Sequence, residues 1–490
     1  MSTHSAHLHG APDISAPESD RRASRKPPRK GWFGALLLRL HFYTGILVGP
    51  FILVAASSGA LYALAPSIEK VIYAHELQVP ATENPLSLAD QIAAATDYLG
   101  DDDDVVLSAV RPAPEPGTTT RVMFQEPGLG ESESRGIFVD PGTGEIRGDH
   151  TVYGTSGAMP VRTWIDQLHR NLHLGTFGRA YSELAASWLG IVALAGLGLW
   201  IFRIRKSRAK KDLIRPNVKL TGYRRILNLH SSIGIWVLLG AVFLSATGIT
   251  WSQFAGGNVS ELRAALNWGT PAVITDLSGT EQVTDEHAEH HGHSAGTATQ
   301  GSGAANPATF DAVLAIGQRI NINSGDVEIK PPAEAGSAWV VQEIHRSYPT
   351  EVDAVAINGA TMEVVDRIDF ADFNLAAKLT RWGIDIHMGS MFGLPNQIVL
   401  FLVAAGIATM VVLGYLMWWK RRPTREPRQL AGTPPRPGAL RRAPWWGVAG
   451  VIVVAVLIGL LLPMVGYTLA GFVVLDTVLG LIHRRRARGD

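Results

Sequence analysis

Cysteine is absent from all 490 residues of the chain. Disulfides, Fe–S clusters and covalently attached c-type haem are therefore excluded. Any metal site must be built from histidine, carboxylate, methionine or backbone groups. Gly-rich phosphate loops and Ser/His/Asp sets are not evident, no soluble domain for a flavin or nicotinamide is recognisable, and no nucleic-acid partner is expected.

Apolar sequence is abundant and gathered in blocks. The chain is 46% hydrophobic, and its apolar runs cover about 42–64, 184–202, 231–252, 398–419, 445–462 and 464–482. A run of about 20 residues can cross a bilayer as a helix. If all six runs span, every basic cluster falls on one side, so the positive-inside rule places both termini in the cytoplasm. The long inserts 66–180 and 253–395 then lie outside.

Two internal repeats organise this topology. Leu40-His41-Phe42-Tyr43-Thr44-Gly45 returns 230 − 41 = 189 residues later as Leu229-His230-Ser231-Ser232-Ile233-Gly234. Within the inserts, the segment 139–146 matches 357–364 at an offset of 357 − 139 = 218. The sequence therefore predicts a polytopic α-helical membrane protein with four core helices in two repeats, a C-terminal helical hairpin and two small extracytoplasmic α+β domains.

The expected segments follow from these features. They are a disordered tail 1–30, TM1 31–65, outer domain 66–160, interfacial helix and TM2 161–203, cytoplasmic loop 204–225, TM3 226–252, outer domain 253–375 with a His-rich linker 276–306, interfacial segment and TM4 376–422, cytoplasmic loop 423–443, the TM5–TM6 hairpin 444–483 and a basic tail 484–490.

Histidines at the predicted helix ends form two matched pairs. His41 and His230 begin spans one and three, whereas His173 and His387 each lie 11 residues before spans two and four (184 − 173 and 398 − 387). Neutral imidazole is a good axial ligand for haem iron, and a haem held by two helices needs both ligands at one depth. His169 shares a helix face with His173, so either could be the ligand. Alternatively, each histidine is an amphipathic anchor at the membrane interface.

A second histidine cluster lies in the low-complexity linker. His287, His290, His291 and His293 have metal-ligand chemistry, and weak binding of Cu, Zn or Ni is one interpretation. A solvated linker is the other.

Taken together, the motifs resemble the family of PepSY-associated transmembrane proteins, which includes iron-regulated membrane proteins and ferric-siderophore reductases. The resemblance covers about residues 31–483 and is carried by the two histidine phrases above, the LHLGTFG and IHMGSMFG segments, the VDPGTGEI hairpin and the MWWKRRP exit. It implies a bacterial inner-membrane reductase with two b-type haems on His41, His230, His173 and His387, which passes electrons from an unknown donor to a ferric siderophore or other metal complex outside.

The sequence is also compatible with two other functions. The outer units resemble a domain associated with protease inhibition, so the chain could be a non-catalytic module that binds or restrains a secreted peptidase. A metal-handling membrane protein that uses the linker 285–293 is a further alternative.

Overall fold

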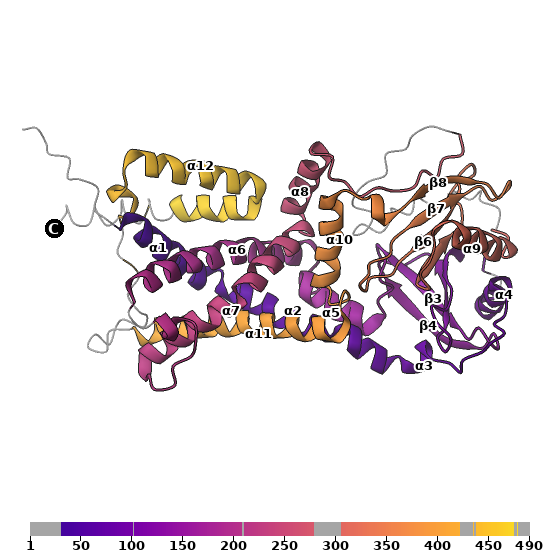
Figure 1. The fold of residues 1–490 in the computed structure, drawn as a ribbon, viewed down its shortest axis with the longest axis horizontal. Helices are drawn as coiled ribbons and strands as arrows, with labels where there is room; N and C mark the ends of the chain where they lie inside the picture. Colours follow the sequence, from indigo (N-terminus) through magenta and orange to yellow (C-terminus); the bar gives the residue numbers. More distant parts are fainter. Residues whose placement is uncertain are drawn as a thin grey trace, which may run out of the picture.

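The protein is described here from a computed structural model, which covers residues 31–100, 102–207, 210–278, 305–421, 435, 438–474 and 478. A bundle of long helices occupies one end of the molecule and an antiparallel sheet the other (Figure 1). The His-rich linker, with His287, His290, His291 and His293, lies outside the described residues.

Four long apolar helices build the bundle. They are α2 (Gly49–Ile72), α6 (Gly175–Lys206), α7 (Gly222–Thr250) and α11 (Gly393–Lys420). Within the described residues these four are long and apolar enough to cross a bilayer, so the chain is a membrane protein. Each helix continues beyond the apolar run that predicts it. In α6 the extension carries Arg203, Arg205 and Lys206, and cations are favourable in a last helical turn.

The first predicted span is divided into two helices near Pro50. Helix α1 (Trp32–Leu47) is separated from α2 by a single residue, Val48, and Pro50 stands in the first turn of α2. Proline has no backbone N–H and clashes with the carbonyl four residues earlier, which is that of Ile46. The Ile46 carbonyl instead accepts a hydrogen bond of 2.6 Å from the hydroxyl of Tyr415. The chain therefore bends here, and His41 lies on α1 rather than on the spanning helix.

The C-terminal helices are shorter than the four bundle helices. Helix α12 (Trp445–Leu461) has 17 residues, and a second apolar helix covers Pro463–Val474. Val465 is buried against Val48 and Ile52, and Trp188 Nε1 donates to Thr468 Oγ1 at 3.0 Å. This pair of helices therefore packs against the bundle, as the predicted hairpin requires.

The two inserts meet in one sheet. Its strand order is β4-β3-β2-β1-β5-β6-β7-β8, and the bounds are β1 (Val106–Arg111), β2 (Thr120–Gln125), β3 (Glu133–Val139), β4 (Ile146–Tyr153), β5 (Val327–Lys330), β6 (Trp339–Glu343), β7 (Ala354–Ile357) and β8 (Val364–Ile368). The first insert supplies β1–β4 and the second β5–β8. Because β1 pairs with β5 antiparallel, the predicted units are joined side by side.

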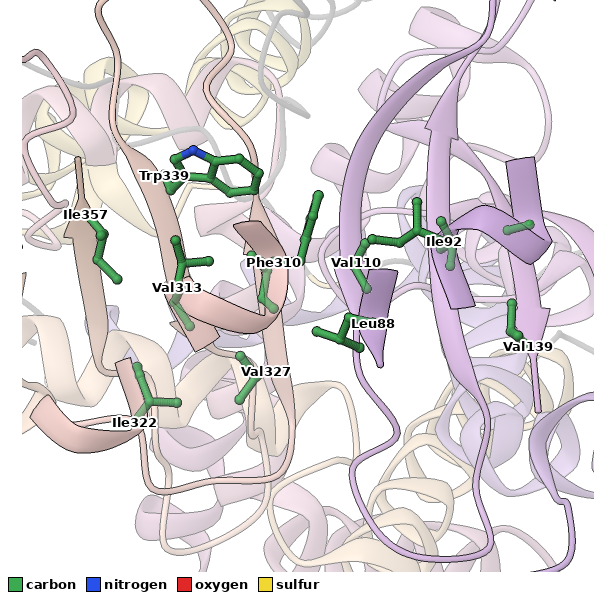
Figure 2. Close-up of a cluster of buried hydrophobic side chains, with 14 of the residues drawn as sticks. Leu88, Ile92, Val110, Val139, Phe310, Val313, Ile322, Val327, Trp339 and Ile357 are labelled. Carbon is green, nitrogen blue, oxygen red and sulfur yellow. The ribbon is translucent and has the colours of Figure 1, made fainter. Parts of the chain in front are cut away.

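One hydrophobic core serves both inserts. Helices α4 (Leu88–Leu99) and α9 (Ala308–Ile320) contribute Leu88, Ile92, Phe310 and Val313 to a single cluster over the sheet (Figure 2). Asp311 on α9 accepts from the backbone N–H groups of Leu88 and Ala89, at 2.9 and 3.1 Å, and thereby caps α4. The capping carboxylate of one insert thus stabilises the helix of the other.

The hairpins at the two edges of the sheet have matching turns. The β3–β4 turn closes with the Asp140 N–H donating to the Glu145 carbonyl, and the β7–β8 turn closes with Asn358 N–H donating to Glu363, both at 2.9 Å. Gly144 and Met362, which are 218 positions apart, both have positive φ, at 75° and 59°. The repeated sequence therefore adopts a repeated turn, although one copy lacks the glycine that such a φ favours.

Short helices connect the sheet to the bundle. These are α3 (Ala74–Leu77), α5 (Pro160–Asn171), α8 (Phe254–Ala265) and α10 (Leu375–His387). Helix α5 leads from the first insert into α6, and α10 leads from the second insert into α11. In Figure 1 they lie where the bundle meets the sheet. This junction holds His169 and His387.

Candidate functional site: two histidine pairs along the bundle

His41 on α1 and His230 on α7 lie face to edge at the bundle end remote from the sheet. Their ring centroids are 6.0 Å apart and their planes are inclined by 81°. Metal–imidazole bonds are about 2 Å long, so two imidazoles that share one metal have centroids roughly 6 Å apart. The centroid distance of this inner pair matches that value. An imidazole binds a metal through an in-plane lone pair, so the ring that presents its face would have to turn before both rings could hold one metal.

Helix α6 orients the inner pair. His41 Nδ1 lies 2.9 Å from the carbonyl oxygen of Val192, which can only accept, so Nδ1 carries the proton and Nε2 keeps its lone pair. A Cβ on Gly196 would lie 3.0 Å from His41 Cε1. His230 Nδ1 is buried without a partner of hydrogen-bond geometry, although the carbonyl of Met410 lies beside the ring. The inner pair thus has one ring, that of His41, whose tautomer is fixed by a hydrogen bond.

At the sheet end of the bundle, His169 on α5 inserts its ring against α2. Its Nδ1 is 3.1 Å from Ser58 Oγ, and that hydroxyl donates to the carbonyl of Val54 at 2.9 Å. When the hydroxyl proton is donated to a carbonyl of α2, its oxygen can accept a hydrogen bond from Nδ1–H of His169. The ring stacks on Tyr62, with centroids 6.0 Å apart and planes within 10°. A Cβ on Gly59 would lie 2.9 Å from His169 Cε1, so only glycine fits there.

His387 at the end of α10 repeats this arrangement on α7. Its Nδ1 lies 2.5 Å from Thr247 Oγ1, which donates to the carbonyl of Phe243 at 2.8 Å. Trp251 contacts the ring edge-on at 5.0 Å between centroids. Burial lowers the pKa of His169 to about 4 and that of His387 to about 3. Both rings are neutral at pH 7, which is the form that binds metals.

The structure places His169, not His173, with His387. Any charge on His169 lowers the pKa of His387 further, after the larger effect of burial, so the two rings are within electrostatic reach. Gly389 also approaches the backbone of Ala63, the neighbour of Tyr62. We call His169 and His387 the outer pair.

His173 is exposed and lies in a separate turn. It and Leu172 have φ of 56° and 53°, and its ring packs on Trp164 with centroids 5.1 Å apart. Its exposed position beside an exposed tryptophan is typical of a membrane-interface anchor, which is the alternative that the sequence leaves open for a lone histidine.

Buried charges surround the outer pair. Arg346 lies 3.6 Å from the sulfur of Met388, next to His387, and 3.7 Å from Asp385. Asp385 is fully buried and also pairs with Arg381 at 3.1 Å. On the α5 side, Arg162 lies 3.5 Å from Glu69. Each of these arginines is paired with a buried carboxylate, so the charges on both sides of the outer pair are largely balanced.

The two pairs are far apart along the bundle. His230 and Thr247, the partner of His387, are 247 − 230 = 17 residues apart on α7. At 1.5 Å per residue this corresponds to roughly 25 Å, which approaches the ~30 Å hydrocarbon thickness of a bilayer. Such an arrangement can hold one redox group near each membrane surface.

The sequence alone assigns no role to Gly196, Ser58 or Thr247. The hydroxyls carry a signal nonetheless, since Ser58 and Thr247 are separated by the same 189 positions as His41 and His230. Among the described residues, no group of three or more His, Asp or Glu side chains has the geometry of a metal site, so any iron here would rely on pairs of histidines and on a macrocycle.

Comparison with models of protein families identifies the family of the chain. Residues 38–421 match the family model described as the PepSY-associated TM region. No curated protein sequence matches the chain. The matched residues include all four bundle helices, the sheet and both histidine pairs.

Proposed function

Since the chain belongs to the PepSY-associated TM family, we propose that it is a transmembrane electron-transfer protein that holds two b-type haems and reduces an extracytoplasmic metal complex. The observation that carries this proposal is the pair of matched imidazole–hydroxyl contacts, Ser58 with His169 and Thr247 with His387. A neutral histidine whose Nδ1–H is held by an acceptor presents Nε2 to a metal, and this arrangement is typical of metal-ligating histidines.

In this proposal the inner haem would be held by His41 and His230 and the outer haem by His169 and His387. When bound, haem iron supplies one-electron transfer between its ferric and ferrous states. The protein's part is to fix the ring tautomers through Val192, Ser58 and Thr247 and to leave space beside them at Gly196 and Gly59.

In this proposal electrons would move from the inner haem to the outer haem, which would lie at the sheet end of the bundle.

The orientation follows from the basic residues. The described chain carries Arg203, Arg205, Lys206, Arg224, Arg225, Lys420 and Arg421 at the bundle end remote from the sheet. By the positive-inside rule we place this end in the cytoplasm and the sheet outside the bacterial inner membrane. The substrate would then be a ferric siderophore or another metal complex that reaches the sheet side.

The function is tested with protein purified in detergent after expression with haem supply. We expect a Soret band that shifts on reduction with dithionite and a further shift back when a ferric chelate is added. A Soret band without reoxidation by ferric or cupric chelates would contradict the reductase while leaving haem binding intact. Truncation of the sheet should leave the inner haem spectrum in place, which separates this function from restraint of a peptidase.

A further inference from the structure

A pocket opens at the cytoplasmic end of the bundle, beside the inner histidine pair. It encloses about 440 Å³ and is lined by Arg203, Ser207, Asp212, Leu220, Tyr223, Arg224, Leu227 and Asn228. These residues come from the end of α6, the 3₁₀ turn Lys210–Leu213 and the loop after it, and the start of α7. Its volume lies within the range of small-molecule sites, about 300–1,000 Å³.

The wall of this pocket is a built structure. Asn228 is buried, with 2% of its surface exposed, and its amide donates to the carbonyl of Asp212 while its Oδ1 accepts from the Asn217 N–H at 2.7 Å. Trp236 Nε1 donates to the carbonyl of Ile214 at 3.0 Å. These bonds fasten the loop 212–217 onto α7, so the pocket keeps its shape.

The pocket is positively charged and carries one aromatic ring. Arg203 and Arg224 line it, Arg421 lies over the ring of Tyr223 at 5.8 Å, and Asp212 is its one acidic lining residue. Guanidinium groups bind phosphate through paired charge-assisted hydrogen bonds, and an aromatic face can stack on a planar ligand. The lining thus matches a ligand with a phosphate at one end and a planar ring at the other.

The pocket lies next to the proposed electron entry point. Asn228 is two residues before His230, and Arg203 Nη1 donates to the hydroxyl of Ser231 at 2.9 Å. A bound molecule would therefore lie within about a helical turn of the inner pair. Because a haem accepts single electrons, the donor must release electrons one at a time, which flavins do and nicotinamide hydride donors do not.

We propose that this pocket binds reduced flavin mononucleotide as the cytoplasmic electron donor, with its phosphate at Arg203 and Arg224. The inference rests on the proposed function, since it names the donor for the inner haem. Reduced flavin mononucleotide would lose two electrons and two protons to become oxidised flavin, and each electron would reduce one ferric haem iron to ferrous.

Binding is measured on the full chain in zwitterionic nanodiscs, by quenching of the fluorescence of oxidised flavin mononucleotide. We expect saturable binding that is about tenfold or more weaker for riboflavin, which lacks the phosphate. The double variant Arg203→Gln with Arg224→Gln should weaken binding of flavin mononucleotide by a similar factor. The double variant Arg203→Lys with Arg224→Lys should restore part of the lost affinity. The matched control is Arg205→Gln with Arg225→Gln, which removes the same charge from exposed positions outside the pocket.

Three results would overturn the proposal. They are equal binding of riboflavin, equal loss in the control pair, and loss of flavin binding in nanodiscs of anionic phospholipid, which would make the pocket a headgroup site. The Soret band of the same samples is read in parallel. A missing Soret band with intact flavin binding would contradict only the haem assignment. A Soret band without flavin binding would contradict only the proposal that the pocket binds flavin mononucleotide.

Discussion

Gly59 and the imidazole of His169 are in such close contact that a Cβ at position 59 would lie 2.9 Å from Cε1 of the ring. Real Cβ contacts are essentially never that short, so any side chain there must displace the ring. The outer pair therefore depends on the absence of a side chain on a neighbouring helix.

Replacing Gly59 by alanine should expel the outer haem without unfolding the bundle. Alanine is about 1 kcal/mol more favourable than glycine inside a helix, so the substitution stabilises α2 itself. The added methyl group instead displaces the ring of His169. We expect the haem-to-protein ratio to fall to about half, because only the outer site is lost. Gly450→Ala is the control, since a Cβ there meets no atom within 4 Å and α12 carries none of the four histidines. Equal haem content in both variants would contradict the contact's role.

Removal of the hydroxyl at position 58 tests the tautomer. Ser58→Ala deletes the acceptor for Nδ1–H of His169 and should weaken the outer haem by about 10–100-fold, as loss of an outer-shell partner does elsewhere. Ser57→Ala is the matched control, because its hydroxyl bonds only to the Leu53 carbonyl. Haem transfer to apomyoglobin measures the retention. Thr247→Val should have the same effect as Ser58→Ala through His387.

The choice between His169 and His173 shows where sequence reasoning stopped. Spacing to the apolar runs favoured His173, but helix α6 begins at Gly175, so the run does not mark the helix start. The repeat offset of the inserts gives the structural answer, since 387 − 169 = 218. The boundaries of an apolar run show only where polar residues stop, and a helix can begin earlier. The 218-residue offset instead identifies equivalent positions in the two repeats.

The bundle helices and the strands were predictable, and the joining of the inserts was not. Apolar run length and alternation are local properties, so they predict α2, α6, α7, α11 and most strands directly. The pairing of β1 with β5 depends on which edges of two similar units meet, and nothing local specifies that. The buried ion pair of Arg111 with Glu328, at 2.6 Å across this junction, becomes visible only in three dimensions.

Met362 offers a stabilising substitution in the β7–β8 turn. A left-handed φ costs a non-glycine residue about 1–2 kcal/mol. Glycine avoids this cost but loses more conformational entropy on folding, which offsets up to about 1 kcal/mol of the gain. Met362→Gly should therefore raise the free energy of unfolding of the sheet by about 0.5–1 kcal/mol. Gly144→Ala, at the equivalent turn with φ of 75°, should lower it. Thermal unfolding followed by circular dichroism compares them, and a destabilised Met362→Gly would refute the assignment of strain.

The Arg111–Glu328 pair predicts loss of stability in acid. Burial raises the pKa of Glu328, but the charges and hydrogen bonds of Lys330 and Arg111 outweigh it and hold the pKa below its ordinary value of 4.5. The folded state thus binds this proton less readily than the unfolded chain. The stabilisation is complete above about pH 4.5 and is lost as pH falls below it.

Glu328→Gln should remove the part of the free energy of unfolding that is lost in acid. At pH 7 the variant leaves Arg111 without its carboxylate, so its free energy of unfolding should be lower than that of the wild type by about 3 kcal/mol. Its melting temperature should change less between pH 5 and 3 than that of the wild type. Glu363→Gln removes an exposed carboxyl and should match the wild type at both ends of this range. If the melting temperatures of Glu328→Gln and the wild type fall in parallel with pH, the Arg111–Glu328 pair is not the cause of the loss of stability in acid.

The central claim is that four histidines hold two haems, with His169 rather than His173 in the outer pair. The most direct measurement is the haem-to-protein ratio of the purified wild type and of single alanine variants, from the pyridine haemochrome spectrum. The account predicts about two haems per chain in the wild type and in His173→Ala. It predicts about one in each of His41→Ala, His230→Ala, His169→Ala and His387→Ala. A wild type without haem, or a loss in His173→Ala with none in His169→Ala, would contradict it.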